Sequence, residues 1–205
     1  ANVSGDAEVV NWRVGRAGAW PDLVRRSPTY HLPTWHYELG ASLVIGEKSL
    51  LKIPDEPGPL PSGTALDSQE LYLSQAVELC KGILADEKQP AADRALALCW
   101  ISHLVADAHQ PCHAGSLYME DVFVEIDGDR GGNRVPTKQR GNLHSLWDQL
   151  LGDRFSTSGV RRRINEIESD KDIQILFKQA TDSAEDLDPR TWLAESRKLA
   201  IERIY

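Results

Sequence analysis

Hydrophobic positions recur at helical spacing over two long stretches in the middle of the chain. The first stretch predicts an amphipathic helix over residues 67–86, with Asp67 and Glu70 forming a capping box at its start. The second predicts a helix over residues 91–110 that ends before Pro111, because proline disfavours helical geometry in the residue that precedes it. Two central helices are therefore predicted.

The rest of the chain favours further helices and one short hairpin. Asn142 has the character of a helix cap, and residues 160–205 predict two or three more helices, the last opening at an Asp-Pro pair. Residues 122–126 and 134–138 flank a turn-rich Asp-Gly-Asp-Arg-Gly-Gly segment and predict a β-hairpin. Four prolines between residues 53 and 66 indicate a loop. The predicted fold class is all-α, mainly helical, with one small β-hairpin.

Composition narrows the picture to a single acidic domain. With 205 residues and 41% hydrophobic composition, the chain can form one packed core, and we assign one domain to residues 1–205. Its 31 acidic residues outnumber 23 Lys and Arg, so the net charge of −8 repels phosphate backbones. Any binding of nucleic acid must therefore rest on local positive charge, which divalent metals would supply. The sequence shows no apolar run of about 18 residues, so we expect no membrane partner.

Two His-x-x-x-Asp pairs carry the first candidate chemistry. Residues four apart lie side by side on a helix, so His103 with Asp107, and His144 with Asp148, each present an imidazole and a carboxylate in one direction. Either pair alone could be a hydrogen-bonded surface pair. His103 and Asp107, however, fall on an apolar stripe, where a carboxylate without a cation or donors is costly. Zinc favours imidazole nitrogen and carboxylate oxygen, so metal binding is the better interpretation.

Three further candidates are weaker when taken singly. Asp22 could be an acid favoured in the first turn of a helix, His36 could be a packed core histidine, and His113 follows the bend at Pro111. Five of the six histidines nevertheless lie in or beside these segments, together with three aspartates. A set of His and Asp without thiolate suits zinc better than manganese or iron, and its carboxylates permit bridging between two metals.

Several competing motifs fail. The chain has no His-Glu-x-x-His, no phosphate-binding P-loop, no Gly-x-Ser-x-Gly and no adjacent His-Asp pair. A calcium loop starting at Asp127 is rejected, because its twelfth position is Lys138 where a bidentate Glu is needed. Cys80, Cys99 and Cys112 form no Cys-x-x-Cys pair, so we expect buried thiols, with a Cys80–Cys99 bridge left open.

Taken together in chain order, these segments resemble a known family. The segments are Ala19-Trp-Pro-Asp22, Trp35-His36-Tyr37, His103-Leu-Val-Ala-Asp107-Ala-His-Gln-Pro-Cys-His113, Gly131-Gly-Asn133, Asn142-Leu-His144-Ser-Leu-Trp-Asp148 and a final segment with Trp192, Glu195, Ser196 and Tyr205. They are similar to those of the zinc-dependent single-strand-specific nucleases of fungi, plants and bacteria, in the phospholipase C/nuclease superfamily. The resemblance spans about residues 17 to 205.

The resemblance implies a mostly helical fold with a cleft lined by up to three zinc ions. Asp107 would bridge two close metals, and Asn133 would stand near the scissile phosphate, whereas His109 would not be a ligand. The implied catalytic residues are Asp22, Asp107 and Asn133. The implied metal ligands are Asp22, His36 and His103 for one ion, His113, His144 and Asp148 for another, and the bridging Asp107.

Two departures from the family pattern bear on these expectations. Family members hold the third metal with an amino-terminal Trp and a following His, for which no equivalent precedes Asp22. We therefore expect no more than two firmly bound metals, and a native chain that extends beyond both ends. Leu39 also stands where relatives often carry an acid that contacts the base.

The resemblance implies an enzyme that hydrolyses single-stranded DNA or RNA to 5′-phosphorylated products and also dephosphorylates 3′-nucleotides. Single-stranded nucleic acid or nucleotides would be its substrate, and a secreted or periplasmic location is expected. Two alternatives remain open: a zinc phospholipase C-like phosphodiesterase, in which Glu usually replaces Asp148, and an inactive metal-binding scaffold.

Overall fold

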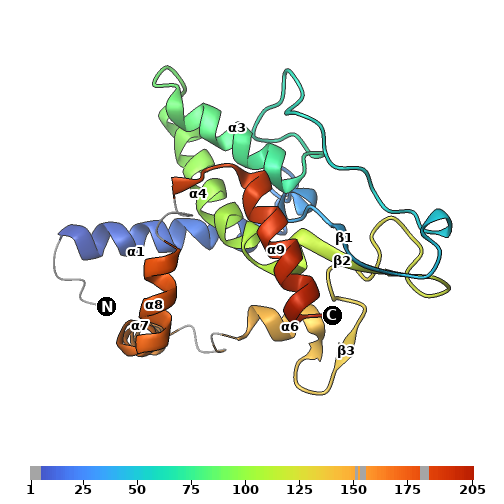
Figure 1. Cartoon of the computed structure of the whole chain (residues 1–205). Helices are drawn as coiled ribbons and strands as arrows, with labels where there is room; N and C mark the ends of the chain where they lie inside the picture. The colour runs from blue at the N-terminus through green and yellow to red at the C-terminus, as the bar shows by residue number, and fades with distance from the viewer. Residues whose placement is uncertain (1–5, 151, 153–155, 181–184) are drawn as a thin grey trace.

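The computed structural model describes residues 6–150, 152, 156–180 and 185–205, and most of them lie in helices. Helices α3 and α4 lie side by side and form the top of the molecule in Figure 1. The helices are α1 (Asp6–Gly18), α2 (Trp20–Leu23), α3 (Leu73–Ala85), α4 (Ala91–Ala108), α5 (Pro111–Ala114), α6 (Leu143–Asp148), α7 (Thr157–Ser169), α8 (Lys171–Gln179) and α9 (Pro189–Arg203), with 3₁₀ turns η1 (Pro33–His36) and η2 (Lys48–Leu50). The mainly helical fold class is confirmed.

The core forms where α4 packs against α3, α9 and η1. Trp35 of η1 and Trp100 of α4 are almost fully buried, and their ring centroids lie 4.8 Å apart. Leu104 and Leu193 extend the same cluster from α4 and α9. Burial of large aromatic rings contributes strongly to stability, so this cluster joins η1, α4 and α9 in one core.

Helix α3 begins six residues later than the predicted start at Asp67. Residues 67–72 form turns instead, and the side chain of Gln75 accepts a hydrogen bond from the Tyr72 amide. The carboxylate of Glu38 accepts from the Ser74 amide at 2.9 Å. Part of the cap of α3 thus comes from a residue 36 positions away, which no local motif could have indicated.

The strands differ more from the prediction. Strands β1 (Gly40–Ile45) and β2 (Gly115–Met119) form a parallel pair that the hydrophobic pattern did not reveal. A small antiparallel hairpin is present, but it joins β3 (Pro136–Thr137) to β4 (Gly141–Asn142). The expected strand over residues 122–126 is wrong, since only an isolated bridge between Met119 and Phe123 occurs there.

The buried carboxylate of Asp129 explains this difference. It accepts hydrogen bonds from the Leu117 amide at 3.0 Å and from the Gly132 amide at 3.1 Å. These bonds fold the glycine-rich segment back onto β2 as a compact loop. A continuous hairpin through residues 122–138 is therefore not formed.

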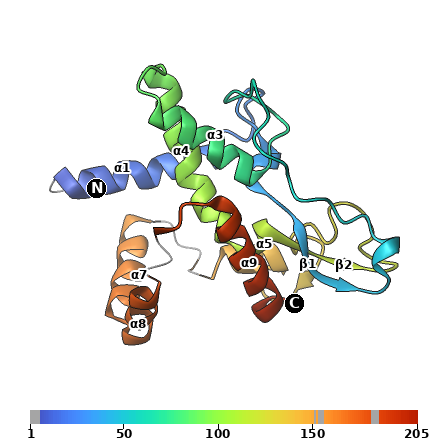
Figure 2. The ribbon, with the colours of Figure 1, turned by 45° about the horizontal axis from the view of Figure 1, so that its top comes forward.

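Helix α9 runs through the middle of the molecule, and α7 and α8 lie on the side of α9 away from β1 and β2 (Figures 1 and 2). The predicted start of α9 is confirmed: the side chain of Asp188 accepts from the Arg190 amide, and Pro189 stands in the first turn. Among the described residues, no helix has the length and apolar character that a bilayer crossing requires.

Candidate metal centre

The predicted ligands gather into two groups of three. The first metal group consists of Asp22 on α2, His36 at the end of η1 and His103 on α4. The second metal group consists of His113 on α5 with His144 and Asp148 on α6. Within each group, one nitrogen or oxygen atom from every residue lies within 4.8 Å of the others. Each group thus has three donor atoms close enough to face a single ion.

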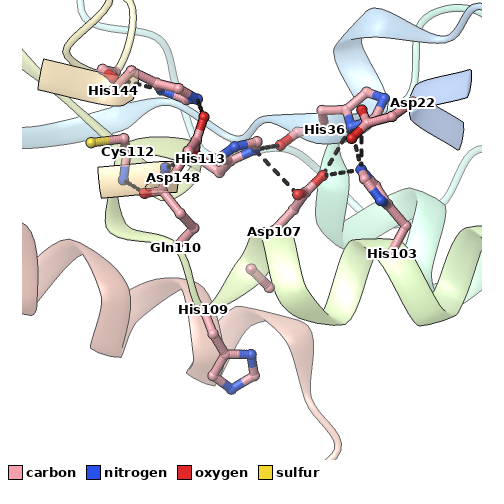
Figure 3. Close-up of polar contacts among 12 residues, drawn as sticks. Asp22, His36, His103, Asp107, His109, Gln110, Cys112, His113, His144 and Asp148 are labelled. Carbon is pink, nitrogen blue, oxygen red and sulfur yellow. Dashed lines mark hydrogen bonds and ion pairs between the residues drawn. The ribbon is translucent and has the colours of Figure 1, made fainter. Parts of the chain in front are cut away.

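Asp107 lies between the two groups, as Figure 3 shows. Its Oδ2 atom is 2.9 Å from His36 Nδ1 and 3.1 Å from His103 Nε2. Its Oδ1 atom is 3.7 Å from His113 Nδ1. One carboxylate therefore faces the first group with one oxygen and the second group with the other.

Three of the histidines are oriented by backbone carbonyls. The Nδ1 atom of His103 donates to the Gly18 carbonyl at 2.7 Å, and that of His113 donates to the His36 carbonyl at 2.7 Å. His144 Nδ1 donates to the Gly131 carbonyl at 2.9 Å. Because a carbonyl oxygen only accepts, Nδ1 carries the proton in each ring. With Nδ1 bonded in this way, Nε2 is the ring atom left to bind a metal, an arrangement typical of metal-ligating histidine.

Local sequence explains how two of these ligands are placed. Asn142 caps α6, since its Oδ1 atom accepts from the Ser145 amide at 2.8 Å, and the cap starts the helix directly before His144. His144 and Asp148 then lie one turn apart, with Nε2 and Oδ2 separated by 3.6 Å. The predicted cap and His-x-x-x-Asp pair are thus both present.

The pKa values of Asp107 and His113 are shifted toward the forms that bind a metal. At His103, burial alone would lower the pKa, but the neighbouring Asp107 carboxylate raises it. Burial alone would raise the pKa of Asp107, but the neighbouring His113, His103 and His36 hold it well below its usual range. Burial lowers the pKa of His113 and so keeps this ring neutral. The donors are imidazole nitrogen and carboxylate oxygen, and burial raises the pKa of the nearby Cys112 thiol to about 12. Such a donor set fits zinc.

The comparisons with known proteins agree with this chemistry. The family model described as S1/P1 nuclease matches residues 7–205. The chain belongs to the S1/P1 nuclease family. Three proteins of Arabidopsis thaliana are similar to shorter stretches of the chain. Endonuclease 4 is 36% identical over 58 residues, which cover 27% of this chain, and Endonuclease 3 is 32% identical over 80 residues, which cover 36% of it. Endonuclease 5 is 37% identical over 60 residues, which cover 28% of this chain. These matches span 16%, 24% and 17% of the respective relatives.

In this S1/P1 nuclease chain, a cavity of about 320 Å³ lies against the segment that follows His36. Tyr37 and Asn133 both line it, and Tyr37 stacks on the ring of His113 with a centroid distance of 4.6 Å. The Asn133 side chain donates to the Arg130 carbonyl at 2.9 Å, which leaves its own carbonyl oxygen free of any intramolecular donor among the described contacts. Asn133 therefore lies at the wall of a cavity that shares Tyr37 with the surroundings of His113.

His109 lies outside the centre. Its Nδ1 atom donates to the Val105 carbonyl at 2.7 Å, and its ring points away from the two groups in Figure 3. His31 is exposed and belongs to neither group. That His109 is no metal ligand stays a prediction, and its ring belongs to neither group.

The sequence did not reveal which residues support the ligands. Gln110 donates to Asp148 at 2.9 Å, and Arg25 donates to Asp22 at 2.6 Å. Gln110 belongs to the recognised His-to-His motif, and the spacing of Arg25 from Asp22 is a helical one, so both positions carried a signal. The carbonyl groups of Gly18 and Gly131 gave no such signal, because every residue has a backbone carbonyl whatever its side chain.

Proposed function

We propose that this S1/P1 nuclease family member is a zinc-dependent phosphodiesterase that hydrolyses single-stranded DNA or RNA to 5′-phosphorylated products. The observation that carries the proposal is the pair of three-donor groups with Asp107 between them. Without a metal, the buried histidines and Asp107 would bring titratable groups close together with no structural benefit. The family match and the names of the three endonucleases support nucleic acid as the substrate.

The proposed zinc ligands are those of the two groups together with Asp107, with two ions as the expected content. Bound zinc would supply the positive charge that activates water and neutralises phosphate oxygens. The side chains themselves bind and orient: Asp22 and Asp107 hold the first site, and Asn133 faces the phosphate. No side-chain nucleophile is required.

The cavity beside the centre supports a nucleotide as the unit that is recognised. Its volume of about 320 Å³ is at the lower end for small-ligand sites, and Tyr37 and Tyr72 supply aromatic faces. Bases of single strands can stack on such faces because they are not held in a duplex. The same cavity would admit a free 3′-nucleotide, and we therefore propose 3′-nucleotidase activity as well. Secretion, the family expectation, stays part of the proposal.

The experiment is a cleavage assay with a fluorescent single-stranded oligonucleotide and its duplex form. We expect zinc-dependent cleavage of the single strand, 5′-phosphate on the products, and loss of activity with a chelator. Asn133→Ala should lower turnover with zinc content unchanged, whereas His31→Ala, at an exposed residue that belongs to neither group, should behave as the wild type. A protein that binds zinc but cleaves neither oligonucleotides nor a phospholipid would be an inactive scaffold. Cleavage of phospholipid alone would favour the phospholipase alternative.

A further inference from the structure

Arg197, on α9, extends its side chain to the segments that follow His36 and His113. Its side chain is 16% exposed and makes three hydrogen bonds in different directions. Nε donates to the Ala114 carbonyl at 2.7 Å, Nη2 to the Glu38 carbonyl at 2.9 Å, and Nη1 to the Glu56 carboxylate at 2.8 Å. Hydrogen bonds from Nε, Nη1 and Nη2 therefore fix the orientation of the guanidinium group.

The two carbonyls belong to the two segments that carry ligands of different metal groups. Glu38 follows His36 of the first group by two residues, and Ala114 directly follows His113 of the second. These segments are also bonded to each other, because the Glu38 amide donates to the His113 carbonyl at 2.9 Å and His113 Nδ1 donates to the His36 carbonyl at 2.7 Å. Through these hydrogen bonds, Arg197 connects the backbone segments that carry His36 and His113.

The backbone around Arg197 leaves room for the guanidinium group. Gly40 and Gly115 are register partners at the start of β1 and β2. A Cβ atom on Gly40 would lie 2.9 Å from both Cζ and Nε of Arg197, too close for any real contact. The close approach of the arginine to the strand pair therefore depends on glycine at this position.

We propose that Arg197 is a positioning residue that fixes the separation between the first and second metal groups. The inference rests on the proposed metal sites and concerns how this chain sets their spacing. Asp107 can contact both groups only if the distance between His36 and His113 is maintained. The guanidinium group of Arg197 binds the backbone close to each of these two histidines. Lysine cannot replace it, because an ammonium group is a point donor without the planar fork that meets separate acceptors.

The test compares Arg197→Ala and Arg197→Lys with Leu193→Ala. Leu193 is a fully buried residue of the same helix, so its truncation matches the loss of α9 packing without touching either carbonyl. Cobalt(II) serves as the probe, and visible absorption reports the coordination geometry during titration. Wild type and Leu193→Ala should bind two ions with the same spectrum.

In Arg197→Ala, the first cobalt ion should still find one intact group, whereas the second should bind about 10- to 100-fold more weakly, as for other changes behind metal ligands. Its spectrum at saturation should also differ from that of the wild type. Turnover should fall by a similar factor while KM for the oligonucleotide stays within about twofold. Arg197→Lys should resemble Arg197→Ala.

Chemical rescue gives a readout that a general loss of stability would not produce. Arg197 lines the cavity, so its removal leaves a space that a small solute can reach. Methylguanidinium at millimolar concentration should restore the cobalt spectrum of Arg197→Ala, whereas methylammonium should not. Leu193→Ala should respond to neither solute.

Three outcomes would overturn the inference in different ways. If wild type binds two ions and Arg197→Ala binds them with unchanged affinity and spectrum, Arg197 does not set the spacing, although the proposed function stands. If wild type binds no cobalt or zinc, the proposed metal centre fails and the inference fails with it. Equal effects in Arg197→Ala and Leu193→Ala, without rescue by methylguanidinium, would assign Arg197 to stability alone.

Discussion

Replacement of Asp107 by Asn isolates the role of the carboxylate that lies between the two metal groups. Asp107 is 8% exposed and contacts His36 and His103 through Oδ2, and it faces His113 through Oδ1. Asparagine keeps the shape and one accepting oxygen, but it replaces the other oxygen by an amide that repels a cation. The change therefore removes a shared ligand with little change in packing.

The expected magnitude follows from linkage between binding and folding. A ligand at 1,000 times its Kd stabilises the folded state by about 4.1 kcal/mol, which raises the Tm of a domain of this size by about 8–16 °C. If Asp107→Asn weakens zinc binding about 100-fold, the same zinc concentration is only 10 times Kd. The stabilisation then falls to about 1.4 kcal/mol, or about 3–6 °C.

The assay is thermal unfolding with and without zinc after removal of bound metal. Only the zinc-induced shift in Tm is compared, so any change in the stability of the metal-free variant cancels. The matched control is His109→Ala, because His109 lies on the same segment with its ring directed away from the centre. A full zinc shift in Asp107→Asn, or equal losses in both variants, would refute the bridging role of Asp107.

Other predictions concern the loop below the second group and the buried thiols. Gly131 has a φ of 57°, and a Cβ there would overlap the Cys112 carbonyl, so Gly131→Ala should displace the acceptor of His144 and weaken zinc binding. Gly141→Ala, at a φ of 81° in open space, should cost only about 1–2 kcal/mol in unfolding and leave zinc binding unchanged. Burial raises the pKa of the Cys80 thiol to about 12, so the folded state keeps a proton that the unfolded state loses above about pH 9. The Tm should therefore fall as pH rises from 9 toward 12, and the slope should be shallower in Cys80→Ala; identical slopes would show that Cys80 does not contribute.

The sequence predicted the helices well where a local signal defined their ends. Pro111 ended the helix that carries His103, and Asn142 and Asp188 capped the helices that follow them. The start of α3 was predicted wrongly, because its amide donors are satisfied partly by Glu38, which lies far away in sequence. Local motifs report local partners only, so a cap of this kind leaves no trace in the periodicity.

The strands and the support of the site show the same limit. Pairing of β1 with β2 joins residues 75 positions apart, such as Gly40 and Gly115. Periodicity and turn motifs describe local segments only, so they do not predict which distant strands pair. The candidate ligand residues could be named because His and Asp are rare on apolar stripes and because the motifs resemble a family. The carbonyl of Gly131 that orients His144 could not, since every residue has one.

The free cysteines settle one alternative that the sequence left open. Cys80, Cys99 and Cys112 are all unpaired thiols in the structure, so the Cys80–Cys99 bridge is not formed. Cys80 and Cys112 are buried, as expected for thiols that pack as small apolar side chains. Stability here rests on the aromatic core around Trp35 and Trp100 and not on a cross-link.

The most direct test of the central claim is metal analysis of the purified, folded protein alongside its cleavage of a single-stranded oligonucleotide. We predict two zinc ions per chain, held by the two groups and Asp107, with cleavage lost on chelation and regained with zinc. Protein that cleaves the oligonucleotide at full rate while holding no metal would contradict it.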